Sequence, residues 1–201
     1  MLVELVDAIT DAGYTPGRDG VAIALDPAAS EFYRDGYYDV AGEKLTSSYM
    51  IARYGEIVSR FPVWSLEDGL AEGDWDGWVR LNAALGDRIQ IVGDDILVTN
   101  PAIIAEAVTR EIANSALIKL NQIGTVTETR EATRLCREAG WSQMVSHRSG
   151  ETEDSFIADL TVATGCGQIK SGAPARGERV AKYNRLIEIE AQHPDLPYAR
   201  V

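Results

Sequence analysis

Short apolar runs alternate with longer amphipathic segments along the whole chain. Several of the short runs are nearly continuous in Val, Ile, Leu and Ala, which is typical of strands that are buried on both faces of a sheet. They predict six strands, at residues 21–26, 63–68, 89–95, 117–122, 144–148 and 168–170.

The segments between these runs have the spacing of helices. Apolar residues recur there close to the helical repeat, and in the first set at i, i+3, i+4 and i+7, so that each set falls on one face of a helix. The sets are Leu2, Leu5, Val6 and Ile9; Trp75, Trp78, Val79 and Leu85; Ile104, Ala107, Val108 and Ile112; and Val180, Tyr183, Leu186 and Ile187.

A further helix is expected to begin at a capping box. Thr125 and Glu128 have the spacing at which the two side chains satisfy backbone N–H groups of a first helical turn, and they predict a helix running to about Gly140. Helices that alternate with strands in this way predict an α/β fold with parallel strands. Two architectures fit: a doubly wound sheet, or part of an eight-stranded barrel with its functional residues at the C-terminal ends of the strands.

Polar residues stand at the ends of the predicted strands. The first three strands end in carboxylates and the next three carry cationic or hydroxyl groups, and parallel strands would bring all these ends to one face. The residues are Asp26, Glu67, Asp94 and Asp95, Lys119, His147, Arg148 and Ser149, and Lys170.

This set of side chains fits a metal ion and an anionic substrate. Carboxylates without cysteine suit a hard cation such as Mg²⁺, while Arg148 can bind a phosphate with two parallel hydrogen bonds. Alone, Asp26 or Glu67 would more often form a turn or cap a helix. Lys119 is harder to explain as structural, because a lysine within an apolar strand is rarely buried without a partner. Taken together, the positions favour an active site.

Composition and charge limit the kinds of partner that the chain is expected to bind. The chain has 201 residues, is 45% hydrophobic and has a formal charge of −12 from 19 basic and 31 acidic residues, which argues against nucleic acid or an anionic membrane as the main partner. No apolar run approaches the roughly 20 residues of a membrane helix, and the N-terminus lacks the pattern of a signal peptide. The two cysteines lie far apart, so we expect a soluble, cytoplasmic chain without a disulfide.

Long segments of the sequence resemble, in order and spacing, the characteristic stretches of the enolases. The resemblance implies the C-terminal catalytic barrel domain of that family, a TIM-like (β/α) barrel that is incomplete here, with about six of its eight strands, over residues 1–201. The segments are ALDPAASEFY, SLEDGLAEGDWDGW, VGDDILVTN, IKLNQIGT, VSHRSGETED and GQIKSGAPAR, with KYNRLIEIE after them.

The resemblance also implies an activity and a metal. Enolases are glycolytic lyases (phosphopyruvate hydratases) that reversibly dehydrate 2-phosphoglycerate to phosphoenolpyruvate with Mg²⁺. By this resemblance, Asp26, Glu67 and Asp94 would be the ligands of the tightly bound Mg²⁺. Lys119 would contact the substrate and act as the base that removes its α-proton, and such a lysine base assisted by Mg²⁺ is a known pattern of the superfamily.

The remaining residues would bind the substrate. By the same resemblance, Arg148 and Ser149 would hold its phosphate together with a second Mg²⁺. Lys170 would bind its carboxylate end, and His147 would line the pocket.

The resemblance leaves part of an enolase unaccounted for. The family's N-terminal capping domain, its general acid (a glutamate) and its mobile loops belong to a segment upstream of the matched stretch, so we expect the 201-residue chain alone to have little or no dehydratase activity. The family further implies a homo-oligomer in full-length form and a cytoplasmic location, although enolases also occur at the cell surface or secreted. Two alternatives stay open: another acid dehydratase of the superfamily, against which the phosphate-binding residues argue, and a non-catalytic interaction fragment.

Overall fold

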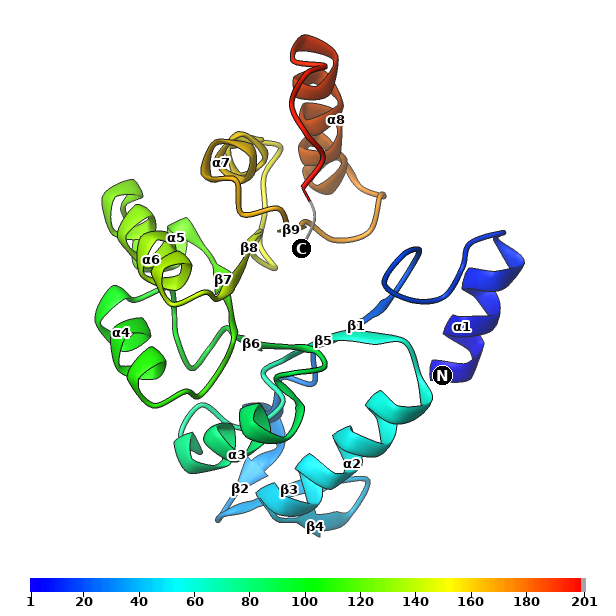
Figure 1. Ribbon diagram of the computed structural model, residues 1–201, viewed down its shortest axis with the longest axis vertical. Helices are drawn as coiled ribbons and strands as arrows, with labels where there is room; N and C mark the ends of the chain where they lie inside the picture. The colour runs from blue at the N-terminus through cyan, green and yellow to red at the C-terminus, as the bar shows by residue number, and fades with distance from the viewer. Residues whose placement is uncertain (200–201) are drawn as a thin grey trace. The chain divides into compact units, whose positions relative to one another are not determined.

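The computed structural model describes residues 1–199, and the last two positions of the expected domain, residues 200–201, lie outside them. The chain forms two compact units, and Figure 1 labels their helices and strands. The first unit comprises Met1–Ile96 with Ala107–Asn114, and the second comprises Leu97–Glu106 with the chain from Ser115 onward. Each unit is built on its own set of parallel strands, as the alternation of strands and helices in the sequence predicts.

The first unit contains three parallel strands, β1 (Ile23–Leu25), β5 (Val63–Glu67) and β6 (Gln90–Gly93). They lie in the order β1-β5-β6, with Leu25 opposite Leu66 and Glu67 opposite Val92. Every residue of β6 is buried. Parallel strands need crossover connections, and α2 (Ser47–Arg60) and α3 (Trp75–Leu85) supply them and pack against each other. The C-terminal ends of these strands carry the predicted acidic residues.

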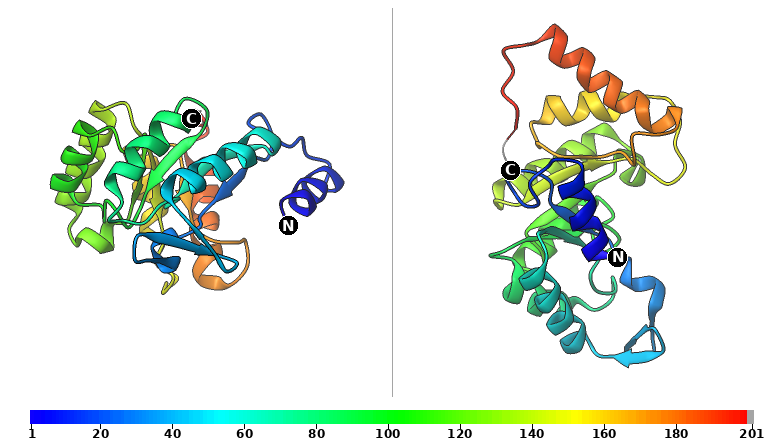
Figure 2. Two further views of the ribbon diagram at one scale, coloured as in Figure 1. Left: turned by 90° about the horizontal axis from the view of Figure 1, so that it is seen from below. Right: turned by 90° about the vertical axis from the view of Figure 1, so that its right-hand side faces the viewer.

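A small antiparallel sheet, which the hydrophobic pattern did not predict, interrupts the connection between β1 and α2. It follows the 3₁₀ helix η1 (Ala29–Phe32) and consists of β2 (Tyr33–Arg34), β3 (Tyr37–Val40) and β4 (Glu43–Leu45), and it lies beside α2 (Figure 2). Both residues of each two-residue turn have positive φ, 52° and 84° in one turn and 54° and 84° in the other, as in type I′ hairpins. The Asp-Gly pair at 35–36 is a known signal for such a turn.

The second unit contains the parallel strands β7 (Ser115–Ile118), β8 (Ser142–Ser146) and β9 (Ile169–Lys170), in that order. Ile118 pairs with Val145, and Ser146 pairs with Lys170. The connections contain α5 (Leu120–Ile123), α6 (Val126–Glu138) and α7 (Phe156–Thr164), and α8 (Gly177–Gln192) packs against α7 (Figure 2). The predicted basic residues follow these strands directly.

The helix N-cap that the sequence predicts at Thr125 is present. Thr125 Oγ1 accepts a hydrogen bond from the N–H of Glu128 at 3.1 Å, and α6 begins where the sequence predicts.

The strand predicted at residues 117–122 is wrong in its second half, since β7 ends at Ile118 and α5 begins at Leu120. Lys119 is therefore not inside a strand but at the junction between strand and helix. A residue that leaves a strand end can reach solvent or a ligand without burying its charge within the sheet.

The helix faces that the sequence predicts to be apolar are buried in some helices and exposed in others. In α3, Trp78 and Leu85 are buried, and Trp78 donates to the carbonyl of Ala71 at 3.1 Å. Residues 2–11 form α1 as predicted, but no residue of α1 is buried. In α8 the predicted stripe is wrong for Ile187, which is 63% exposed. The buried positions of α8 are instead Lys182 and Ile189.

Among residues 1–199 no helix is both long enough and apolar enough to cross a bilayer. The cysteines Cys136 and Cys166 are both free thiols.

Candidate active site

In the first unit, the predicted metal ligands occupy the C-terminal ends of adjacent strands. Asp26 directly follows β1 and is exposed, Glu67 is the last residue of β5, and Asp94 directly follows β6. Glu67 and Asp94 are each only 7% exposed. The strand order β1-β5-β6 therefore places one predicted carboxylate at the end of each neighbouring strand.

A tighter acidic cluster at the same strand ends includes a residue that the sequence reasoning did not select. Carboxylate oxygens of Asp68, Asp94 and Asp95 all lie within 4.8 Å of one another. Asp68 accepts backbone hydrogen bonds at 3.0 Å from both partners, with Oδ1 bound to the N–H of Asp94 and Oδ2 to the N–H of Asp95. It thus ties the end of β5 to the turn that carries Asp94.

The electrostatics of this cluster fit a bound cation. Burial raises the pKa of Asp68 to about 7, because the two backbone N–H groups lower it less than burial and the negative charges of Asp94 and Asp95 raise it. A divalent cation among these oxygens would relieve that repulsion. The donors are oxygens only, which suits a hard ion such as Mg²⁺. The residues present therefore fit a metal ion, with Asp68 already engaged by the backbone.

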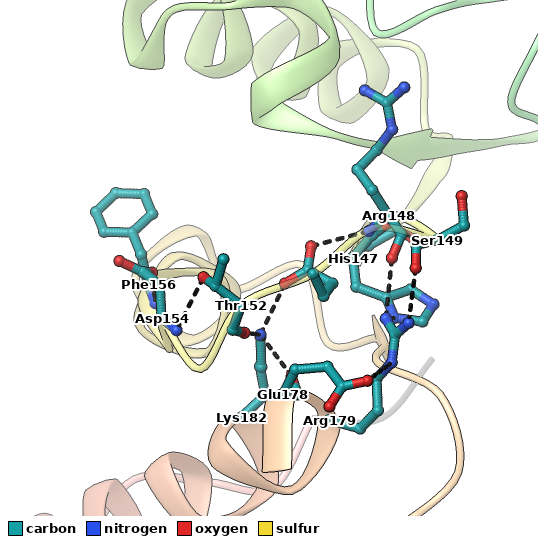
Figure 3. Close-up of polar contacts among 11 residues, drawn as sticks. His147, Arg148, Ser149, Thr152, Asp154, Phe156, Glu178, Arg179 and Lys182 are labelled. Atoms are coloured by element: carbon teal, nitrogen blue, oxygen red, sulfur yellow. Dashed lines mark hydrogen bonds and ion pairs between the residues drawn. The ribbon is translucent and has the colours of Figure 1, made fainter. Parts of the chain in front are cut away.

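In the second unit, His147, Arg148 and Ser149 form a turn directly after β8, shown in Figure 3. We call these three residues the basic turn. Its first residue continues the sheet, since the N–H of His147 donates to the carbonyl of Lys170 at 2.9 Å. The basic turn is therefore fixed to the end of β9 as well as to β8.

Two lysines lie near the basic turn. Lys170 ends β9, and Lys119 follows β7, where its N–H donates to Thr99 Oγ1 at 2.9 Å. Burial lowers the pKa of His147 from its ordinary value, and the positive charges of Arg179, Lys170 and Lys119 lower it further against the opposing effect of Glu151. The second unit thus brings together all the basic residues that the sequence selected.

Three side chains that the sequence reasoning missed hold the basic turn (Figure 3). Arg179 donates to His147 Nδ1 and, at 2.9 and 3.0 Å, to the carbonyls of Arg148 and Ser149. Glu151 Oε1 accepts from the N–H of Arg148 at 3.0 Å. These contacts make the turn a supported element rather than a free loop.

The third missed residue is Lys182, which is completely buried. Its Nζ donates to Glu151 Oε2 at 2.7 Å and to the carbonyls of Thr152 and Glu178 at 2.6 and 2.7 Å. All three ammonium hydrogens therefore have an acceptor. The sequence did contain a signal, because Lys182 lies seven residues before the buried Ile189 and so on the same face of α8.

The segment after the basic turn has two roles. Asp154 Oδ1 accepts from the N–H of Phe156, the first residue of α7, at 2.8 Å, as expected of a capping carboxylate. Glu151 does not cap this helix, because it bonds Lys182 and Arg148 instead. Distant partners on α8 decided this, and they are invisible to local spacing.

Comparison with known proteins identifies the family. The family model described as the enolase C-terminal TIM barrel domain matches residues 1–198. An enolase of Acidothermus cellulolyticus is 58% identical over 191 residues, which is 95% of this chain and 44% of the relative. Enolase 1 of Methanospirillum hungatei is 56% identical over 94% of this chain and 44% of the relative. For enolase 1 of Methylococcus capsulatus the values are 58%, 93% and 45%.

The match covers nearly all of this chain but less than half of each relative. The chain thus spans 44–45% of the length of these curated relatives. The family match decides between the two architectures that the sequence left open, in favour of the barrel and against a doubly wound sheet. The chain belongs to the enolase family and corresponds to its C-terminal TIM barrel domain.

Proposed function

We propose that this chain carries the metal ligands, the base and the phosphate-binding turn of a Mg²⁺-dependent phosphopyruvate hydratase, which interconverts 2-phosphoglycerate and phosphoenolpyruvate. The observation that supports this most strongly is the gathering of Lys119, His147 and Lys170 in the second unit, at the ends of its parallel strands. Several cations grouped around one turn suit a substrate with more than one negative group.

The basic turn is the proposed phosphate site. The Arg148 guanidinium can present two parallel N–H donors to phosphate oxygens, and the Ser149 hydroxyl can donate a third hydrogen bond. Arg179 already occupies the carbonyls of these two residues, so their side chains are the parts left to bind a ligand. Lys170 would hold the carboxylate end of the substrate as a point charge.

Lys119 is the proposed base. The proton α to a carboxylate is very weakly acidic, and its removal places a second negative charge on the carboxylate oxygens. The position of Lys119 supports this role. It is the N-cap residue of α5, directly after β7, so its side chain starts at the end of the strand and not within the sheet. Its backbone N–H is held by Thr99 Oγ1, which fixes the point from which the side chain extends.

Asp26, Glu67 and Asp94 are the proposed Mg²⁺ ligands, with Asp68 holding the turn that carries Asp94. When bound, Mg²⁺ supplies Lewis-acid stabilisation of the charge that develops on the substrate carboxylate, which is typically worth several kcal/mol. The two buried carboxylates, Glu67 and Asp94, are suited to this because burial away from water strengthens the attraction of a ligand for a cation.

Proton removal can be tested separately from complete dehydration. The chain is incubated with 2-phosphoglycerate and Mg²⁺ in D₂O, and loss of the α-proton signal is followed by NMR while phosphoenolpyruvate is followed by its ultraviolet absorbance. We expect α-proton exchange that requires Mg²⁺ and disappears in Lys119→Ala. Exchange that persists in Lys119→Ala would exclude Lys119 as the base.

Competition separates this proposal from the alternative dehydratase. Addition of glycerate, which lacks the phosphate, is expected to leave exchange of 2-phosphoglycerate unchanged, and Arg148→Met is expected to weaken binding of 2-phosphoglycerate. Equal binding of the phosphorylated and unphosphorylated acids would instead favour a dehydratase of the superfamily that acts on another acid. Absence of any binding to the folded chain would favour a non-catalytic role.

We place this function in the cytoplasm. The support is chemical: Cys136 and Cys166 are free thiols, as is usual where the surroundings are reducing. We also expect a homo-oligomer in the full-length protein.

A further inference from the structure

The geometry of α8 points to a role for Arg179 that the proposed catalytic residues do not cover. We propose that Arg179 is a positioning residue that fixes the tautomer of His147 and the backbone of the basic turn. A second positioning element, the Glu151–Lys182 ion pair, holds the same turn through the backbone N–H of Arg148. The inference relies on the proposed function only for the identity of the anion that the turn receives.

The tautomer of His147 follows from the chemistry of its partner. Arg179 Nη1 contacts His147 Nδ1, and a guanidinium has donors but no acceptor. Nδ1 must therefore supply a lone pair, and the single proton of the neutral ring must be on Nε2. Burial and the positive charges of Arg179, Lys170 and Lys119 lower the pKa of His147, which favours the neutral ring. His147 thus offers Nε2–H as a donor, the form that suits an anionic ligand.

Arg179 also determines the backbone of the basic turn. Its two terminal nitrogens donate to the carbonyls of Arg148 and Ser149 at 2.9 and 3.0 Å. Those carbonyls would otherwise be free to point toward the anion and repel it. Holding them on the α8 side leaves the two side chains on the turn to meet the ligand, as Figure 3 shows for the contacts of Arg179.

Glu151 and Lys182 hold the backbone N–H of Arg148 in the same turn. Glu151 uses one oxygen for the N–H of Arg148 and the other for the buried ammonium of Lys182. Lys182 in turn bonds two carbonyls, one of them on α8 and one in the segment after the basic turn. The chain of contacts from α8 through Lys182 and Glu151 therefore fixes the amide of Arg148 relative to α8.

A glycine makes room for this arrangement. Gly172 has φ of +79°, and a Cβ built there would lie 3.1 Å from Arg179 Cδ and 3.3 Å from His147 Cε1. Its carbonyl accepts a hydrogen bond from the Tyr183 hydroxyl. The segment after β9 thus lies against the arginine and the imidazole, so that a larger residue at position 172 would press on both.

Imidazole ¹⁵N spectra test the inference directly. The chain has two histidines, and His193, which is exposed, serves as an internal reference assigned through His193→Gln. At neutral pH we expect His147 to show an unprotonated Nδ1 and a protonated Nε2 in the wild-type chain. Protonation of Nδ1 in the wild-type chain would overturn the inference before any variant is made.

The variants then separate positioning from general stability. In Arg179→Met we expect His147 to change toward the mixed tautomer pattern of His193. Arg185→Met is the matched control, because Arg185 is another arginine of α8 whose partners are Asp159 and Glu188, and it should leave His147 unchanged. An unchanged tautomer in folded Arg179→Met would overturn the inference. If that variant does not fold, Arg179→Lys, which keeps the charge but not the fork of donors, is measured in the same way.

Phosphate binding distinguishes this inference from the proposed function. Inorganic phosphate is titrated while the amide signals of Arg148 and Ser149 are followed, and Arg179→Met is expected to weaken the apparent affinity on the order of tenfold, as loss of a supporting residue commonly does. A wild-type chain with the expected tautomer but no phosphate binding would support positioning by Arg179 and contradict the phosphate site. Equal affinity in both chains would contradict the effect of positioning on the ligand.

Discussion

Lys182 and Glu151 form a buried ion pair in the second unit, with Nζ 2.7 Å from Oε2 and exposed side-chain fractions of 1% and 12%. Such a pair is costly to bury and stabilises only when its remaining hydrogen bonds are satisfied. Here they are, because Lys182 has two carbonyl acceptors and Glu151 accepts the N–H of Arg148. The pair therefore connects α8 to a turn that is proposed to bind the substrate.

Loss of one member of this pair should be more harmful than loss of both. Lys182→Met leaves the Glu151 carboxylate largely buried without its ammonium partner and should lower the free energy of unfolding on the order of 3 kcal/mol. The double variant Lys182→Met with Glu151→Gln removes the uncompensated charge and should recover part of that loss. Urea denaturation of the wild-type chain and the two variants measures this, and a double variant that is less stable than Lys182→Met would contradict it.

Glu151 should also make stability depend on pH. Burial of Glu151 raises its pKa, but the hydrogen bonds from Lys182 and Arg148 outweigh this, so that the pKa in the folded chain is below the ordinary value of 4.5. A lowered carboxyl pKa contributes stability at pH values above the unfolded pKa, and this contribution is lost as the pH falls through the folded pKa.

The comparison with Glu151→Gln isolates this contribution from those of other carboxyls. We expect the wild-type chain to be more stable than Glu151→Gln at neutral pH and the difference to shrink as the pH falls below about 4.5. Chemical denaturation at a series of pH values measures it. A difference that stays constant down to acid pH would show that Glu151 does not stabilise through its charge.

Gly172→Ala should disturb the basic turn. An alanine at φ of +79° costs about 1–3 kcal/mol in backbone strain, and its Cβ would press on Arg179 and His147. We expect a lower thermal midpoint together with a changed imidazole ¹⁵N spectrum. Gly150→Ala is the control, since a Cβ there meets nothing within 4 Å. A stable Gly172→Ala chain with an unchanged spectrum would show that the space at Gly172 is not needed.

Asp68 should affect metal binding through the turn that carries Asp94. In the wild-type chain each carboxylate oxygen of Asp68 accepts one backbone N–H, from Asp94 or Asp95. In Asp68→Asn only one side-chain oxygen remains as an acceptor, and the side-chain NH₂ group, a donor, would face the second backbone N–H. We expect a loss of about 1–3 kcal/mol in stability and weaker Mg²⁺ binding by calorimetry. Asp87→Asn, an exposed acidic position of the same unit, is the control. Unchanged Mg²⁺ affinity would contradict a supporting role for Asp68.

The sequence alone predicted much of the arrangement of strands and helices. Continuous apolar runs mark strands that are buried on both faces, and this signal is local, so β5, β6 and β8 fall within a few residues of their predicted positions. The helix N-cap at Thr125 is likewise local and is confirmed. The pattern missed the hairpins of β2, β3 and β4, since strands of two to four residues give too little alternation to detect.

For the candidate site, the sequence selected the residues that follow strand ends, because parallel strands place such residues on one face whatever the rest of the fold. It did not select Arg179, Glu151, Lys182 or Asp68. Each of these side chains has at least one partner that is 26 to 32 positions away in the chain, and the identity of that partner depends on which helix packs on which turn. Strand ends could thus be read from local order, whereas the support of the basic turn was decided only by tertiary packing, because hydrogen bonds between distant segments leave no periodicity in the sequence.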